Sequence, residues 1–354
     1  MKIKVIILEN DAVYLNRIAT AFNVKYADKL EVYSFTEKET AIEFAASSKV
    51  DVFLANESID MDVEALPSHC GFAYLVESME IESIKNEIAI CKFQKAELIY
   101  KQILSIFSEK VTDITGIHLS DGEGNSVIAF VSASGGVGSS VAAAACAMNF
   151  AKKGKKVLYL NLEKYGNADL FFSAEGVGNL GDIIYAIKSK KGNLSMKLES
   201  TVKQDASGVY FYSPTKVALD LAELKFDEVQ KLIKDIKMFG GYEYIILDMD
   251  FAVDKNNMKM LQSCNKIVFV SDGSEIANNK LVRAMEAFSI LDQQDDSKLI
   301  MRSVLLFNRF SSQTSQVVNI GEMKQIGGIK RFEGLGTKQL LQQVSENMVF
   351  DNLA

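Results

Sequence analysis

The stretch that decides the fold runs from Val127 to Glu163 and reads VIAFVSASGGVGSSVAAAACAMNFAKKGKKVLYLNLE. It begins with an apolar run, Val127–Val131, passes through a turn with three glycines into an alanine-rich segment, and ends with a second apolar run, Val157–Asn161. Short apolar runs bounded by turn residues are typical of buried strands, and alanine is the strongest helix former. The stretch therefore predicts a strand, a loop, a helix and a second, parallel strand.

The loop of this stretch, Ser134-Gly135-Gly136-Val137-Gly138-Ser139-Ser140, has the composition of a phosphate-binding loop. Three glycines let the backbone fold closely around an anion and direct several N–H groups toward it. The helix that follows adds its own unpaired N–H groups and the positive end of its dipole. An ordinary tight turn is the alternative, but it leaves the flanking strands and helix unexplained. We therefore expect the loop to bind the phosphates of a nucleotide.

One side chain of the usual phosphate loop is missing. Such loops end in Gly-Lys-Ser/Thr, with the lysine on the β- and γ-phosphates, whereas Ser139 stands in the place of that lysine here. A charge-assisted hydrogen bond contributes about 1.5–3 kcal/mol, so its loss weakens binding roughly tenfold to over a hundredfold. Ser140 retains the hydroxyl that would hold Mg²⁺. Binding can survive on the backbone cradle, but hydrolysis is less secure because it relies on positive charge at the transferred phosphoryl group.

Two domains are expected from the length of 354 residues and from the order of the apolar runs. Strands and helices alternate almost to the C-terminus, which predicts an α/β fold with mostly parallel sheets. Residues 1–112 hold five expected strands, as in a small doubly wound domain. Residues 113–125 are rich in Gly, Asp and Ser and read as a linker, and residues 126–354 form one larger α/β domain.

Composition excludes several classes of protein. No stretch approaches the ~20 apolar residues of a membrane span, and the N-terminal apolar run ends in acids without a signal-peptide cleavage site, so we expect a cytoplasmic protein. The four cysteines form no Cys-x-x-Cys pair, which argues against disulfides or zinc. Residues 1–112 carry 12 basic and 18 acidic residues, and the remainder carries 27 and 28, so neither part has the basic excess of a nucleic-acid binder.

Three further motifs follow later strands of the second domain: Asn161-Leu162-Glu163, the segment YEYIILD that ends at Asp248, and the segment VLLFNRF at Val304–Phe310. With the loop, these motifs resemble the ParA/MinD family of deviant Walker ATPases, whose loop reads Lys-Gly-Gly-x-Gly-Lys-Ser/Thr. The sequence looks closest to the TadZ/CpaE branch, pilus-assembly proteins of the tight-adherence (Flp) system. Members of that branch join an atypical receiver domain to such an ATPase, and many lack the loop lysine. The resemblance covers nearly the whole chain.

This resemblance implies a role for each matching residue. Ser134 stands in the place of the signature lysine that reaches the nucleotide of the partner subunit, and Glu163 keeps a role in orienting the metal-bound water or the nucleophile. Asp248 is the Walker B aspartate that holds Mg²⁺ through water, although a solvated acid at a strand end is the alternative. Asn308 bonds the edge of the adenine, with Arg309 beside it, although Asn after a strand is also a common turn residue.

The implied site therefore binds ATP through the seven loop residues, Asn308 and Arg309, holds Mg²⁺ through Ser140 and Asp248, and uses Glu163 and Asp248 in catalysis. We expect the metal to be weakly bound or dispensable. Lys164 and Arg309 are both candidates to replace the missing lysines, and the turn Gly334-Leu335-Gly336 is a candidate to close over the adenine. The run Gly176–Gly181 fits Gly-x-Gly-x-x-Gly, with Glu199 at the distance of a ribose acid, but it follows no clear strand and reads as the loop before a helix.

The first domain resembles a receiver that has lost its phosphate acceptor. A receiver needs an acidic pair after its first strand, an aspartate after its third and a lysine after its fifth. Here Glu9-Asn10-Asp11 and Lys92 fill the first and last places, but Asn56 stands at the acceptor position. Asparagine cannot form an acyl phosphate, so the resemblance implies a CheY-like (flavodoxin-like) domain kept for docking or dimerisation. An unrelated small α/β domain is the alternative.

The sequence therefore predicts an ATP-binding protein that forms a nucleotide-dependent homodimer and localises or assembles a tight-adherence pilus machine, with weak or absent ATP hydrolysis. The alternative is an active, partner-stimulated ParA/MinD-type ATPase switch in positioning or DNA partition. The tail from Thr337 has an apolar face without the cationic face that anionic lipids select, so we expect no membrane-targeting helix. The expected partners are pilus and secretion assembly proteins, which would place the chain at the cell pole or at inner-membrane machinery.

Overall fold

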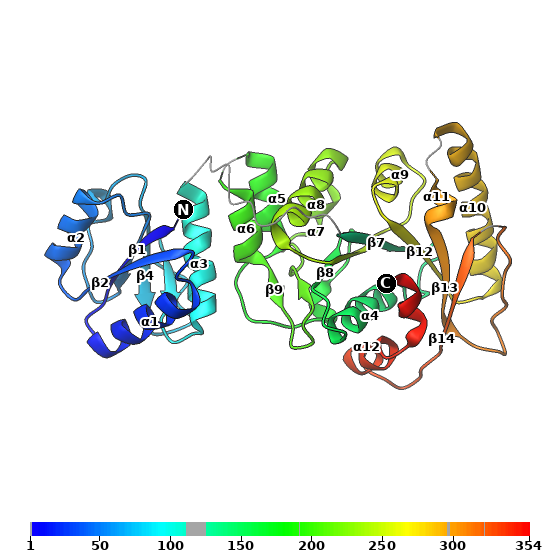
Figure 1. The fold of residues 1–354 in the computed structure, drawn as a ribbon, viewed down its shortest axis with the longest axis horizontal. Helices are drawn as coiled ribbons and strands as arrows, with labels where there is room; N and C mark the ends of the chain where they lie inside the picture. The colour runs from blue at the N-terminus through cyan, green and yellow to red at the C-terminus, as the bar shows by residue number, and fades with distance from the viewer. Residues whose placement is uncertain (1, 111–124, 191, 296–297, 322) are drawn as a thin grey trace. The chain divides into compact units, whose positions relative to one another are not determined.

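The alternating apolar segments form two sheets, each in a unit of its own, in the computed structural model (Figure 1). The first unit is built from the N-terminal part of the chain together with Tyr185–Thr201, and the remainder forms the second unit. The structure describes residues 2–110, 125–190, 192–295, 298–321 and 323–354. The expected linker therefore lies outside the described residues, apart from Asn125, and the domain boundaries stay a prediction.

The sheet of the first unit has the strand order β2-β1-β3-β4-β6-β5, in which all pairs are parallel except β5 with β6. This is the doubly wound, receiver-like order, with one antiparallel strand added at the edge. Its strands are β1 (Ile3–Leu8), β2 (Leu30–Phe35), β3 (Val52–Asn56), β4 (Gly71–Val76), β5 (Ser83–Ile84) and β6 (Glu87–Cys91). Its helices are α1 (Ala12–Lys25), α2 (Lys38–Ser47), η1 (Val63–Ala65), α3 (Ala96–Lys110) and α6 (Leu194–Thr201).

Helix α6 joins the core of the first unit although it lies far along the chain. It packs on α3, and Met196 is buried in the same apolar cluster as residues of α1, α3 and the sheet. Glu199 forms an ion pair with Lys29 and accepts a hydrogen bond from the hydroxyl of Tyr100 at 3.1 Å. The first unit is therefore completed by a segment that the sequence places inside the second domain.

The sheet of the second unit has the order β14-β13-β12-β7-β11-β8-β10-β9, and only β9 is antiparallel to its neighbour. Its strands are β7 (Ser126–Val131), β8 (Val157–Asn161), β9 (Lys203–Gln204), β10 (Tyr210–Phe211), β11 (Tyr244–Asp248), β12 (Lys266–Ser271), β13 (Ser303–Phe310) and β14 (Lys324–Lys330). Its helices are α4 (Ser139–Lys152), η2 (Ala168–Leu170), α7 (Ala218–Ala222), α8 (Phe226–Gly240), α9 (Lys255–Gln262), α10 (Glu275–Asp295), α11 (Leu299–Arg302), α12 (Thr337–Ser345) and η3 (Met348–Leu353), and α5 (Leu180–Ser189) begins in it.

Helix α4 is almost enclosed by the protein. Its alanines, Ala142–Ala145, are fully buried and let it lie directly on β7, β8 and β11, while α12 packs against another side (Figure 1). Leu341 and Val344 of α12 are buried there, whereas Met348, which follows α12, is 79% exposed. Because α4 is held on both sides, its N-terminus and the preceding loop have a fixed place at the carboxyl edge of the sheet.

Three short or irregular strands were absent from the sequence prediction. β5 and β9 contain two residues each, too few for a hydrophobic pattern. β14 (KQIGGIK) contains two glycines and buries only Ile326 and Ile329, because it forms an edge of the sheet. No described helix combines the length and the apolar character that a membrane span requires.

Replacing Met196 by Ala should destabilise the first unit by about 2–5 kcal/mol, because the side chain is 6% exposed and its removal leaves a cavity between α6 and α3. Met79→Ala is the matched control, since Met79 lies in the same unit and is 69% exposed; we expect a change within about 0.5 kcal/mol. Hydrogen exchange of the α3 amides in the full chain measures the effect. Equal protection in the two variants would contradict the placement of α6.

Candidate functional site

The loop between β7 and α4 forms an open cradle that depends on glycine. Gly136 and Gly138 have φ angles of 80° and 82°, a region that side chains rarely adopt. A β-carbon on Gly138 would lie 2.6 Å from Nδ2 of Asn308, whereas one on Gly135 or Gly136 would meet no atom within 4 Å. One side of the loop is therefore packed against protein, and the other side is open at the N-terminus of α4.

Two residues at the end of β13 contact the backbone of the loop. The amide nitrogen of Asn308 donates to the carbonyl oxygens of Val137 at 3.0 Å and Gly138 at 3.1 Å. Nη1 of Arg309 donates to the carbonyl oxygen of Gly136 at 2.7 Å. Both sequence-predicted residues are thus brought to the loop, but the amide nitrogen of Asn308 is used by the loop itself. Its role at the edge of an adenine stays a prediction.

Asp248 lies beside the loop at the end of β11 and is fully buried. Its Oδ2 accepts hydrogen bonds from the hydroxyl of Tyr159 at 2.6 Å and from Nδ2 of Asn161 at 3.0 Å. Its Oδ1 has no hydrogen-bond partner in the described part of the chain. Tyr159 was missed by the sequence reasoning, because a tyrosine inside an apolar strand carries no functional signal.

Two hydroxyls of the first turn of α4 complete this group. Oγ of Ser140 donates to Oε2 of Glu163 at 2.9 Å, which brings together two of the predicted residues. Oγ of Ser139 is buried and has no partner among the described residues. A buried polar atom without a partner is costly, so Ser139 and Asp248 both indicate a bound group that would satisfy them.

Burial controls the protonation of the two carboxyl groups. Burial raises the pKa of Glu163 above its usual value. Burial, and then the neighbouring charge of Glu163, raise the pKa of Asp248 to about 8. The nucleotide-free protein therefore holds a proton on Asp248 at neutral pH, and a divalent cation at this place would displace it.

These residues fit a nucleotide with a divalent cation. Strand register places Asp248 beside Phe130, the penultimate residue of β7, and beside Asn161 at the end of β8, so the loop and the carboxylates share one edge of the sheet. Backbone N–H groups and the helix dipole suit phosphate, and a hydroxyl with a carboxylate suits Mg²⁺. No cluster of three or more His, Cys, Asp or Glu residues forms a protein-only metal site in the described residues. A metal here would rely on phosphate oxygens as ligands.

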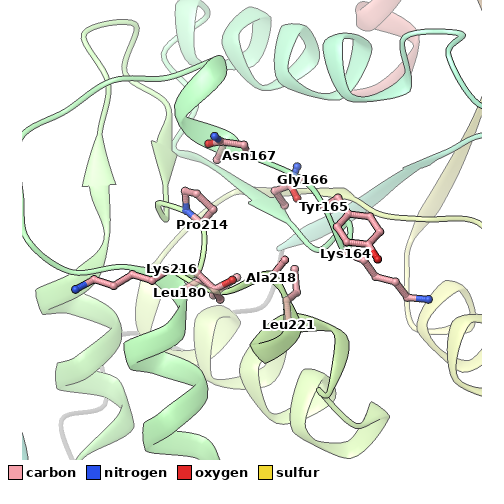
Figure 2. Close-up of a pocket in the computed structure, with 12 residues that line it drawn as sticks. Lys164, Tyr165, Gly166, Asn167, Leu180, Pro214, Lys216, Ala218 and Leu221 are labelled. Atoms are coloured by element: carbon pink, nitrogen blue, oxygen red, sulfur yellow. The ribbon is translucent and has the colours of Figure 1, made fainter.

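A cavity of about 280 Å³ lies beside this group and was not foreseen (Figure 2). Asn161, which bonds Asp248, contributes to its wall, and the side chain of Lys164 extends away from it. The lining residues are Asn161, Lys164, Tyr165, Gly166, Asn167, Ala168, Leu180, Pro214, Thr215, Lys216, Ala218 and Leu221. The sequence does not predict this cavity, because its walls come from segments far apart in the chain.

Two glycine-containing segments singled out in the sequence lie outside the group around Asp248. The run Gly176–Gly181 leads into α5, and Glu199, its potential ribose acid, is paired with Lys29 and Tyr100 in the first unit. The loop reading of this run therefore agrees with the structure. The turn Gly334–Gly336 directly precedes α12, and its role over an adenine stays a prediction.

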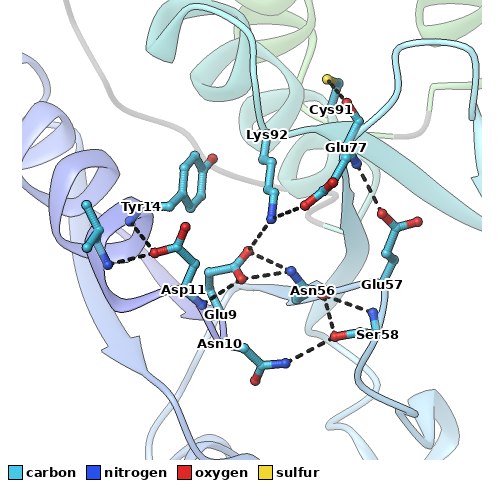
Figure 3. Close-up of polar contacts among 11 residues, drawn as sticks. Glu9, Asn10, Asp11, Tyr14, Asn56, Glu57, Ser58, Glu77, Cys91 and Lys92 are labelled. Carbon is cyan, nitrogen blue, oxygen red and sulfur yellow. Dashed lines mark hydrogen bonds and ion pairs between the residues drawn. The ribbon is translucent and has the colours of Figure 1, made fainter.

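The receiver-like pocket of the first unit is a closed hydrogen-bonded network (Figure 3). Leu8 pairs with Ala55 in the sheet, so the next residues, Glu9 and Asn56, meet at its carboxyl edge. Nδ2 of Asn56 donates to both carboxylate oxygens of Glu9, at 2.8 and 2.9 Å. Nζ of Lys92 lies 3.6 Å from Glu9 and 3.0 Å from Glu77.

The remaining acid of this pocket is also used. Asp11 caps α1 by accepting hydrogen bonds from the backbone N–H groups of Val13 and Tyr14 (Figure 3). Oδ1 of Asn56 accepts hydrogen bonds from the backbone and the hydroxyl of Ser58. The pocket therefore holds an amide at the acceptor position, and its carboxylates are bound by protein donors.

Comparison with known families finds a match for each part of the chain. A family model described as an AAA domain matches residues 125–301, half of the chain, and one described as a TadZ-like receiver domain matches residues 1–108. The chain belongs to the ParA/MinD-like AAA-domain family. Its N-terminal part is a TadZ-like receiver domain. A comparison with curated proteins finds no match.

Solved structures of the ParA/MinD-like family share the fold of the second unit. A ParA family ATPase from Chlorobium tepidum TLS is 21% identical, with a TM-score of 0.53 over 65% of this chain and 98% of its own. The septum site-determining protein MinD from Pyrococcus horikoshii OT3, complexed with Mg-ADP, is 16% identical, with a TM-score of 0.50 over 64% of this chain and 92% of its own. Because the sequence identities are below 25%, these two matches show that the fold is shared and show nothing further.

The raised pKa of Asp248 predicts a pH-dependent stability. The unfolded chain releases this proton near pH 4 and the folded protein near pH 8, so the folded state binds more protons in between. The free energy of unfolding should therefore fall as pH rises from about 4 to 8, and Asp248→Asn should reduce that slope. Urea unfolding without nucleotide or Mg²⁺ measures it. Asp227→Asn, which changes an exposed aspartate of α8 in the same unit, is the control, and equal slopes in the two variants would contradict the prediction.

Lys92→Met should destabilise the receiver-like domain by about 3–5 kcal/mol, because it leaves the carboxylate of Glu9, which is 1% exposed, without its buried cation. The control is Lys85→Met, which breaks an exposed ion pair with Asp60 and keeps an unbranched side chain at a position with a φ angle of 51°, so it should have little effect. Chemical unfolding of the full chain distinguishes them. A similar loss in both variants would show that the network contributes no more than a surface ion pair.

Proposed function

We propose that this chain binds ATP with Mg²⁺ at the loop of its second unit, dimerises in the nucleotide-bound state, and localises or assembles a tight-adherence pilus machine. The observation that supports nucleotide binding best is the open glycine cradle beside Oγ of Ser139 and Oδ1 of Asp248, two buried polar atoms that have no hydrogen-bond partner among the described residues. Membership of a nucleotide-binding ATPase family agrees with this use of the cradle. The MinD relative named above was solved with Mg-ADP.

Each group of the site has a definite task in this proposal. Backbone N–H groups of the loop and of the first turn of α4 bind the phosphates. Ser140 and Asp248 would hold the cation, and Asp248 would have to release its proton to do so. Mg²⁺ would neutralise phosphate charge there. The hydroxyl of Ser140 can offer a lone pair to a cation and still donate its hydrogen to Glu163, so this contact would orient Glu163 beside the cation.

Hydrolysis should be weak or absent because the cradle has no lysine. Ser134 and Ser139 occupy the two positions at which the resembling family carries lysine, and a hydroxyl brings no positive charge to the transferred phosphoryl group. A site of this kind can hold ATP as a structural ligand. Nucleotide would then stabilise a dimer without being consumed rapidly.

The pilus assignment and the protein partners rest on the first unit. It matches a TadZ-like receiver domain, and its acceptor position is an asparagine whose amide is bonded to Glu9. A domain that cannot take up a phosphoryl group keeps its surface for contact with other proteins. We therefore assign it to docking on assembly proteins, with the cell pole or the inner-membrane machinery as the place of action.

A second candidate function is a partner-stimulated ATPase switch in positioning or DNA partition. The observation that favours it is the contact between Ser140 and Glu163 beside Asp248, which brings a candidate general base next to the metal position. DNA partition additionally requires salt-sensitive binding to duplex DNA. An absence of such binding would dismiss that form of the switch.

Calorimetric titration of the full chain with ATP and Mg²⁺ tests the binding proposal. We expect saturable binding, and sedimentation should show more dimer with ATP than without. Gly138→Ala should abolish binding, since a β-carbon there collides with Asn308. Gly328→Ala, where a β-carbon makes only ordinary contact with Phe307, is the folded control. No heat of binding at millimolar ATP would reject the proposal.

Phosphate release distinguishes the two functions. The binding proposal predicts release near background in the wild type and in Asp248→Ala. The switch predicts turnover that rises with a partner and that Asp248→Ala removes. Release that exceeds background, and that the substitution abolishes, would favour the enzyme.

A further inference from the structure

Arg309 has an unusual backbone conformation at the end of β13. Its φ angle is 56°, in the left-handed region that residues other than glycine, asparagine and aspartate seldom adopt. The register between β13 and β14 shifts between Phe307 and Phe310, so Asn308 and Arg309 leave the regular ladder there. Strained residues of this kind persist where the surrounding structure holds them, and they cluster at ligand sites.

The strained backbone directs the side chain of Arg309 onto the phosphate loop. Its Cδ lies 3.6 Å from the place that a β-carbon on Gly138 would take, and its Nη1 donates to the carbonyl oxygen of Gly136. Gly135 and Gly136 form the open side of the cradle. The guanidinium therefore lies at the rim of the loop, and one of its five N–H groups is used. The others have no partner in the described part of the chain.

The rival candidate, Lys164, is placed differently. Its backbone N–H donates to Oδ2 of Asp250 at 3.0 Å, and its side chain extends away from the cavity that it lines (Figure 2). No hydrogen bond joins it to the loop among the described residues. Of the two residues that the sequence offers as replacements for the missing lysines, Arg309 is the one that contacts the cradle.

We infer that Arg309 binds the phosphates of the nucleotide from outside the loop, in the same subunit, and provides part of the binding affinity that lysine provides in other phosphate loops. A guanidinium is always charged and can bind phosphate through two parallel hydrogen bonds, so it suits a fixed position at the rim. The hydrogen bond to Gly136 and the left-handed backbone of Arg309 hold its guanidinium group in place before a nucleotide binds. This inference rests on the proposed function, since it requires ATP at the loop.

Calorimetry with ATP, ADP and AMP tests the inference in the full chain. Arg309→Gln should weaken ATP binding roughly tenfold to a hundredfold, with smaller losses for ADP and AMP, because the lost contact is to phosphate. Binding of ATP should also become less sensitive to salt. If Arg309 only held the loop in place, or contacted the base, Arg309→Gln would weaken the binding of all three nucleotides equally. That result would overturn the inference.

Three variants separate this role from a folding defect. Arg309→Gly relieves the strained φ angle, so it should be at least as resistant to thermal unfolding as Arg309→Gln while binding ATP as weakly. Ser139→Lys introduced into Arg309→Gln should recover at least tenfold in ATP affinity, and unchanged affinity would count against the replacement of charge. Arg331→Gln removes an exposed arginine paired with Glu333 and should bind ATP like the wild type.

The outcomes also distinguish this inference from the function on which it rests. If the wild type does not bind ATP, the proposed function is wrong and the inference falls with it. If the wild type binds ATP and Arg309→Gln binds equally well, the inference alone is wrong.

Discussion

The close approach of β13 to the start of α4 is the contact on which the second unit depends. Asn308 reaches carbonyl groups 170 and 171 positions earlier in the chain, and it can do so because Gly138 has no side chain. β12 and the long helix α10 bring β13 to its place in the sheet, and the buried alanines fix α4. The shape of the loop is thus determined by tertiary packing and not by its own sequence alone.

Both candidate sites carry uncharged side chains at positions where the resemblance in the sequence leads us to expect charged ones. In the first unit, the acceptor carboxylate is replaced by the amide of Asn56, and Lys92 remains to neutralise Glu9. In the second unit, hydroxyls stand where lysines are expected, while the carboxyl group of Asp248 keeps its proton through burial. Neutral groups cost less to bury than charged ones, so these side chains lower the free-energy cost of burying each site.

Much of the fold could be predicted from the sequence, because its long buried strands and amphipathic helices carry clear patterns. The order of the two domains follows from the order of these patterns along the chain. Ser140, Glu163 and Asp248 were expected at one edge of the sheet, because the carboxyl ends of parallel strands lie together. What could not be predicted depends on packing between distant segments. No local sequence pattern indicates three features: the hydrogen bond from Tyr159 to Asp248, the cavity beside Asn161, and the packing of α6 in the first unit.

Helix α6 has a consequence for how this protein can be divided. A module that moves freely between proteins lies on one uninterrupted piece of chain, whereas the core of the first unit includes Met196 from beyond the phosphate loop. A chimaera that exchanges only the residues before the linker would leave α6 facing a foreign helix in place of α3. The two units of this protein can therefore be recombined with relatives only when the receiver and this helix are inherited together.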